Sequence, residues 1–229
     1  MSDRVARFVG LYATIAAGVA AVVAPLLGLA YFAIPIGAEE ETGTVAVWAE
    51  PARELAGGLL TWASADRVYA SYTQVFALIV PAVLLCAWVT RARRGRAGSR
   101  LERWGWRVSL VAYGMLAAGL AIVALMLIGV SASSTTLDYA YLPLVFPGIV
   151  FGTIGSTVLG VGLLRAGYEP RATAWLLALV FPLWIVGDFL IGHNSLGLVP
   201  LFLAWATTGW RLFRAGWSAA DTREAVTVG

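Results

Sequence analysis

The sequence predicts an all-α protein: a polytopic membrane protein built as a bundle of six transmembrane helices. Three observations predict it. The chain of 229 residues is 60% hydrophobic and only 13% charged, whereas soluble domains are about one-quarter charged. The charges lie between long apolar stretches, each near the ~20 residues that cross a hydrocarbon core as a helix. Arginine-rich and acidic loops alternate along the chain. We expect residues 1–229 to form a single integral membrane domain.

The apolar stretches predict six spans. In order, they are residues 8–36, 68–90, 107–131, 141–164, 172–191 and 196–213. The first span follows two arginines, as a signal peptide would. Its apolar part is longer than the roughly 7–15 residues of a signal-peptide core, so we expect an uncleaved helix.

The loop between the first two spans, residues 37–67, carries a helical pattern of its own. Pro51 suits a first helical turn. The large apolar residues of the segment fall on one side at helical spacing: Trp48, Leu55, Leu59 and Trp62. This pattern is typical of a short amphipathic helix at the membrane interface. Such a helix serves either as a lid over a cavity or as a plain surface connector, and the sequence leaves both open.

The arginines predict the orientation, because short loops rich in basic residues stay in the cytoplasm. Seven arginines lie in residues 91–107, and the loop between the fourth and fifth spans adds Arg165 and Arg171. The opposite loops are acidic. Both termini are therefore expected in the cytoplasm, in a bacterial-type cytoplasmic membrane. We expect the membrane lipids to be direct partners, with anionic headgroups at the 91–107 loop.

The fourth span contains small residues at every fourth position: Gly148, Gly152, Ser156 and Gly160. Such stripes let helix backbones approach closely in lipid, which predicts a packing role and a place at the bundle centre. Ser156 is also the best candidate for a buried nucleophile. At 1.5 Å per residue it lies ~22 Å from its end of the helix, too deep to reach the only histidine, His193.

A parallel internal repeat is a further hypothesis. YASYTQVFALIV in the second span resembles YAYLPLVFPGIV at the fourth, and YATIAAGVAAV in the first resembles YGMLAAGLAIV in the third. Spans one and two would then correspond to spans three and four, as in the internal repeats of many transporters. Coincidence is the alternative, because alanine, valine, leucine and glycine dominate these spans.

The segment GDFLIGHNSLG, residues 187–197, holds the strongest candidate site. Asp188 is an acid inside an apolar span, and an ionisable residue in that position marks a site by default. With His193, Asn194 and Trp184 it would line a small polar pocket that opens outward. The structural alternative is a tight turn, in which Gly192 ends the fifth helix and Ser195 caps the sixth.

These features favour a non-catalytic structural, accessory or small-ligand-binding membrane protein. The alternatives are a small transporter or permease with a pocket near Asp188, and a lipid-acting membrane enzyme. One cysteine and one histidine make a metal cluster or a haem with two histidine ligands implausible, and we expect no cofactor and no metal. The arginines are membrane-loop arginines, so no nucleic acid is expected. A membrane protein partner fits the accessory role.

Overall fold

The computed structural model describes residues 2–41, 43–94, 99–128 and 141–227, with side chains as far as Arg214 except at Tyr141 and Ile191. Helices follow one another without a strand in these ranges. Their bounds are α1 Asp3–Tyr31, α2 Pro35–Glu40, α3 Gly43–Leu60, α4 Ala65–Arg94, α5 Arg100–Met126, the π-helical turn η1 Tyr141–Val145, α7 Phe146–Arg165, α8 Arg171–Ile191, α9 Asn194–Gly197 and α10 Val199–Thr227.

Six of these helices are long and apolar enough to cross a membrane, which confirms the predicted fold class. The candidate spans are Asp3–Tyr31, Ala65–Arg94, Arg100–Met126, Leu142–Arg165, Arg171–Leu190 and Asn194–Arg214. The predicted first span, 8–36, is displaced. Its helix ends at Tyr31, and a new short helix begins at Pro35, because proline suits the first turn of a helix. Residues 129–131 of the predicted third span lie outside the described residues.

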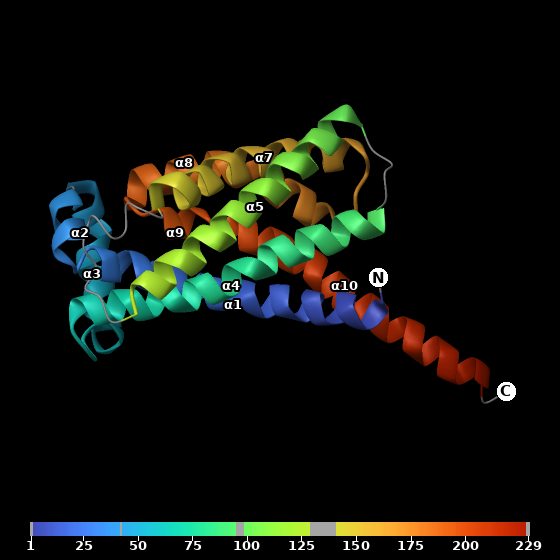
Figure 1. Cartoon of the computed structure of the whole chain (residues 1–229), viewed down its shortest axis with the longest axis horizontal. Helices are drawn as coiled ribbons and strands as arrows, with labels where there is room; N and C mark the ends of the chain where they lie inside the picture. Colours follow the sequence, from blue (N-terminus) through green and yellow to red (C-terminus); the bar gives the residue numbers. More distant parts are fainter. Residues whose placement is uncertain (1, 42, 95–98, 129–140, 228–229) are drawn as a thin grey trace.

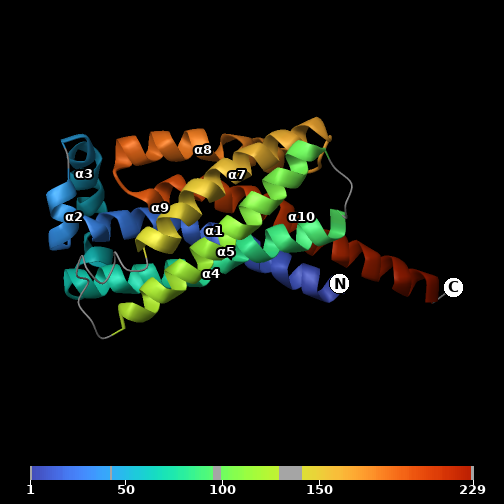
Figure 2. The same ribbon diagram turned by 45° about the horizontal axis from the view of Figure 1, so that its top comes forward.

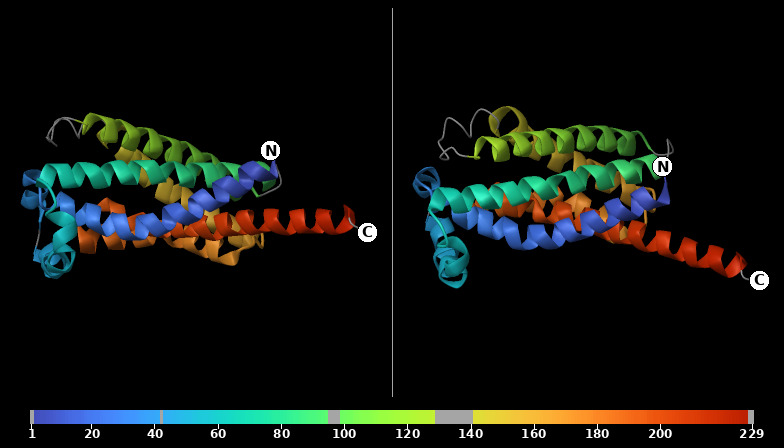
Figure 3. Two further views of the ribbon diagram at one scale, coloured as in Figure 1. Left: turned by 90° about the horizontal axis from the view of Figure 1, so that it is seen from below. Right: turned by 60° about the horizontal axis from the view of Figure 1, so that its bottom comes forward.

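The six long helices form a ring in sequence order. Each span packs against the next, and α10 closes the ring by packing against both α8 and α1. Figures 1 and 2 show the helices running side by side along the long axis of the molecule. The last part of α10 extends past the other helices, as both views in Figure 3 show.

The fourth span lies in this ring rather than at its centre. Helix α7 packs between α5 and α8, and its small residues serve both neighbours. A Cβ on Gly148 would meet the Leu116 backbone of α5 at 2.8 Å, whereas one on Gly160 would meet the Ala178 backbone of α8 at 2.2 Å. The stripe thus divides between two contacts, because an α-helix drifts around its axis by ~40° every four residues.

Aromatic and hydroxyl groups bond inside the ring. Tyr113 Oη lies 2.5 Å from Ser156 Oγ and accepts a hydrogen bond of 3.3 Å from Trp205 Nε1. Ser156 also donates to the carbonyl of Gly152 in its own helix. These bonds satisfy the hydroxyls of Tyr113 and Ser156 between α5, α7 and α10, and Ser156 is part of this packing network.

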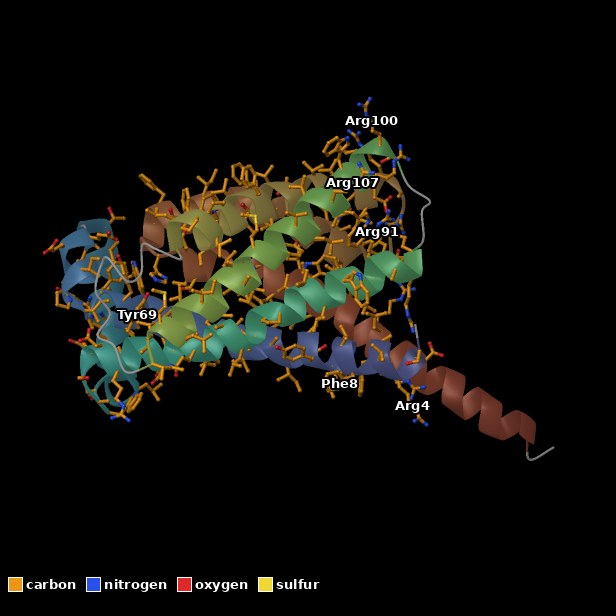
Figure 4. The ribbon with its side chains drawn as sticks, in the orientation of Figure 1. Arg4, Phe8, Tyr69, Arg91, Arg100 and Arg107 are labelled. Carbon is orange, nitrogen blue, oxygen red and sulfur yellow. The ribbon has the colours of Figure 1, made fainter. Side chains whose placement is uncertain are left out.

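The two ends of the bundle differ in charge. One end, which we call the arginine-rich end, carries both the N-terminus and the α4–α5 and α7–α8 connections. Figure 4 shows Arg4, Arg91, Arg100 and Arg107 gathered there. The opposite end, which we call the acidic end, carries α2, α3 and the α8–α9 turn (Figure 1). The arginine-rich connections therefore lie at one end of the bundle and the acidic first loop at the other, as the charges of the loops predict.

Helix α3 lies across the acidic end, as Figure 2 shows. Val45 and Ala49 pack against Leu29 near the end of α1 and against Phe32 just after it. Leu55, Leu59 and Trp62 are exposed, by 92%, 53% and 52%, as expected for the apolar side of an interfacial helix. Trp48 differs from the prediction: its ring centroid lies 6.3 Å from that of Phe32, so it packs on the bundle instead.

Candidate ligand-binding site

A cavity of about 290 Å³ opens at the acidic end, inside the ring of helices. We call it the end cavity. It is near the lower limit of the volumes that small-molecule sites have. Its lining comes from α1, α2, α4, α5, η1 and α9, from the α8–α9 turn and from Leu198 just after α9. The residues are Leu27, Tyr31, Ile36, Glu40, Tyr69, Thr73, Phe76, Leu120, Val123, Val145, Gly192, His193, Asn194, Ser195 and Leu198.

Most polar residues of the end cavity lie near its mouth, and the deepest lining residues on α1, α4 and α5 are apolar: Leu27, Phe76 and Leu120. Tyr31, Glu40 and Tyr69 lie within about one turn of a helix end on the acidic side, and His193 lies in the connecting turn. Phe76 lies two turns further along α4 than Tyr69, about 10 Å at 1.5 Å per residue. The cavity therefore has an apolar floor and carries most of its polar groups near its mouth.

The turn after α8 positions the histidine. Gly192 ends the helix in the left-handed conformation, with φ 71°, and its N–H donates to the Asp188 carbonyl at 2.8 Å. Glycine adopts that conformation without steric cost. The predicted helix end at Gly192 is confirmed.

The predicted cap of the next helix is wrong. His193, not Ser195, is the N-cap residue of α9, and its Nδ1 accepts from the Ser195 N–H at 3.3 Å. Ser195 Oγ lies 2.7 Å from the same ring nitrogen and donates to the carbonyl of Ala24 at 2.8 Å. Through these bonds the serine and the histidine join the turn to α1.

Aromatic rings surround His193. Its ring centroid lies 5.1 Å from that of Tyr31 and 6.4 Å from that of Phe32. Burial among these groups lowers the pKa of His193 to about 4, because a low-dielectric surrounding disfavours the charged imidazolium. The imidazole is therefore neutral at pH 7.

This lowered pKa predicts a loss of stability in acid. The unfolded chain binds a proton at His193 near pH 6.5, and the folded chain does so only near pH 4. Between these values the unfolded state holds more protons, so stability falls as pH falls. We expect this residue to remove about 2 kcal/mol between pH 7 and pH 4.5.

The measurement is the free energy of unfolding against pH for the wild type and His193→Gln. This is the only histidine, so the difference between the two curves isolates it from the titrating carboxylates. Parallel curves between pH 7 and pH 4.5 would contradict the burial argument.

The sequence-predicted site residues separate into three positions. His193 and Asn194 line the end cavity. Trp184 is 9% exposed and is not a lining residue, but it contacts one, since its Nε1 donates to Asn194 Oδ1 at 3.1 Å. Asp188 is not among the lining residues. It is partly buried on α8, and within the described part of the chain its carboxylate has no ion pair. The structure thus brings three of the four together.

Sequence reasoning missed the part of the site that comes from the first half of the chain. Tyr31, Glu40, Tyr69 and Thr73 line the same cavity as His193. The Tyr31 hydroxyl donates to Glu40 Oε2 at 2.7 Å. No local pattern marks these residues, because only the closure of the ring brings α1, α2 and α4 next to the α8–α9 turn. Only Tyr31 and Tyr69 carry even a weak signal, since each is a polar residue within about one turn of the end of an apolar span.

The fold and the site together define the class: a polytopic membrane protein with six candidate spans and a cavity at one end of the bundle. No family model, curated protein or solved structure matches the chain. The functional argument therefore starts from the chemistry of the end cavity.

Proposed function

We propose that the protein is a non-catalytic, small-ligand-binding integral membrane protein that holds one amphiphilic molecule in the end cavity. The observation that carries this proposal is an apolar floor below a mouth that holds most of the polar groups of the cavity. An amphiphile matches that order, with its polar group beside Tyr31, Glu40 and His193 and its apolar part toward Leu27, Phe76 and Leu120. Concave, mostly apolar sites with a few placed polar groups are the usual form of small-molecule sites.

The proposal is tested by blocking the end cavity. Val123 lines it and is 4% exposed, whereas its neighbour Ile122 is 40% exposed and absent from the lining. Val123→Phe places a ring in the cavity, and Ile122→Phe is the matched control. We expect native mass spectrometry of gently extracted protein to show a stoichiometric small molecule on the wild type and on Ile122→Phe, and none on Val123→Phe.

Two results would reject the function. The first is a wild type without any small-molecule adduct. The second is the same adduct on Val123→Phe, because the molecule would then bind elsewhere. A co-purifying membrane protein in place of a small molecule would favour the accessory role instead.

We further propose that the arginine-rich end faces the cytoplasm of a bacterial-type cell and contacts anionic lipid headgroups through residues 91–107. Three facts support a basic surface here. Arg107 lies over the Trp104 ring at 5.9 Å, Trp104 is 53% exposed, and Figure 4 shows arginines gathered at this end. Arginine and tryptophan side chains suit the headgroup region of a membrane.

Cysteine labelling tests the orientation. Cys86 is the only cysteine and is buried, so Cys86→Ala gives a background without accessible thiols. We expect a membrane-impermeant maleimide on intact cells to label Glu54→Cys on α3 and to leave Ser2→Cys unlabelled until the cells are opened. Labelling of Ser2→Cys alone in intact cells would show that the protein has the opposite orientation in the membrane.

A further inference from the structure

The charge at the mouth of the end cavity is negative. Glu40 is the carboxylate among its described lining residues, and no arginine is among them. The negative charge of the adjacent Glu41 is paired with Arg53, whose Nη2 lies 2.7 Å from Glu41 Oε2. Glu40 instead accepts a hydrogen bond from the neutral Tyr31 hydroxyl. A full negative charge therefore stands at the polar end of a cavity whose histidine is uncharged.

Aromatic rings stand beside this carboxylate. The Tyr31 ring, which bonds Glu40 through its hydroxyl, has its centroid 5.9 Å from that of Tyr69 and 5.1 Å from that of His193. All three residues line the end cavity. The faces of aromatic rings attract cations within about 6 Å of their centroids. A carboxylate joined to clustered aromatic rings is the arrangement that recognises an organic ammonium group.

We propose that the ligand of the end cavity carries an ammonium group, which pairs with Glu40 and lies against the rings of Tyr31 and Tyr69. This inference rests on the proposed function and names the ligand class of the same site. The apolar part of the ligand extends toward Leu27, Phe76 and Leu120, which makes it an alkyl- or arylalkylammonium amphiphile. An anionic amphiphile is disfavoured by its repulsion from the exposed Glu40 carboxylate.

Three probes of equal chain length test the charge preference. Octylammonium, octanol and octanoate differ at pH 7 only in the polar group. Binding is measured by calorimetry on protein in nanodiscs of zwitterionic lipid, with empty nanodiscs subtracted. We expect octylammonium to bind at least about tenfold more tightly than octanol, and octanoate to bind most weakly.

Paired variants assign the effect to one carboxylate. Glu39 and Glu40 are neighbours on α2, and only Glu40 lines the cavity. Because Glu40 is exposed, Glu40→Gln is expected to weaken octylammonium by up to about fivefold and to leave octanol unchanged. Glu39→Gln makes the same change in net charge and is expected to alter neither affinity. The two variants thus separate a local ion pair from the general field of the acidic end.

The outcomes distinguish a failure of the ammonium inference from a failure of the proposed ligand-binding function. Equal binding of octylammonium and octanol, or an unchanged octylammonium affinity in Glu40→Gln, would overturn the ammonium inference while leaving the ligand site in place. If none of the three probes binds above empty nanodiscs, or if they bind Val123→Phe as tightly as the wild type, both proposals fail. Weaker octylammonium binding in Glu39→Gln to the same extent as in Glu40→Gln would also overturn the inference.

Discussion

Replacing Glu102 by alanine is expected to destabilise the folded protein by about 3 kcal/mol. The side chain is 1% exposed at the start of α5. Its Oε1 accepts from Arg94 Nε at 2.5 Å and from Trp106 Nε1 at 3.2 Å, and its Oε2 accepts from Arg94 Nη2 at 3.3 Å. The variant leaves a mostly buried guanidinium and an indole N–H without their acceptor, and an unpaired buried charge costs far more than an exposed one.

An exposed ion pair at the same end provides the control. Arg93 and Asp3 approach to 2.7 Å, with side chains 35% and 58% exposed. Exposed pairs contribute about 0–1 kcal/mol, so Asp3→Asn should change stability little. The measurement is the free energy of unfolding in mixed micelles for both variants. Equal effects would show that Glu102 does not hold the α4–α5 connection as the structure indicates.

Replacing Gly160 by alanine is expected to destabilise the bundle by about 3 kcal/mol, at the upper end of the usual cost of overpacking. The added Cβ would lie 2.2 Å from the Ala178 nitrogen and 2.7 Å from the Ala174 carbonyl oxygen. Both atoms belong to the backbone of α8, so no side chain can rotate away. The variant must therefore push α8 from α7, and contacts along the whole pair are lost.

The same substitution at Gly152 should be tolerated. A Cβ there meets Ala112 Cβ at 3.6 Å and the Tyr113 ring at 3.7 Å, which are ordinary contacts. Gly152→Ala adds the same methyl group to the same helix, and alanine favours a helix over glycine by about 1 kcal/mol. Thermal unfolding of both variants measures the difference. Similar losses at the two positions would contradict the α7–α8 contact described here.

The six spans could be predicted from the sequence because each depends on local composition. An apolar run of the right length needs no partner to be recognised, and the helix end at Gly192 depends on one residue that tolerates a positive φ. The end of the first helix was misplaced by about five residues, since the apolar segment continues through Phe32 to Ile36 after the helix stops. Composition therefore predicts that a span exists, and here Pro35 indicates that the first helix has ended before it.

The end cavity could be predicted only in part, because ten of its fifteen lining residues come from parts of the chain distant from the 187–197 segment. His193 and Asn194 stood out as polar residues in an apolar sequence. Tyr31 and Glu40 did not, since their relation to His193 exists only after α1 packs on α10. Asp188 stood out equally and lies outside the lining. An unusual residue in the sequence identifies a candidate site residue, and the packing of the helices determines which residues it contacts.

The parallel repeat stays a hypothesis. Helices α1 and α4 pack together, as do α5 and α7, but adjacent antiparallel helices do so without any duplication. Tyr139, at which the matched segment of the fourth span starts, lies outside the described residues.

The most direct test of the account is an experimental structure of the protein in nanodiscs formed from its own membrane. The account predicts a bound molecule in the end cavity, with its polar group within reach of Glu40 and the Tyr31 ring and its apolar part toward Phe76. A closed cavity, in which the side chains of α1, α4 and α5 meet and leave no space beside His193, would contradict it.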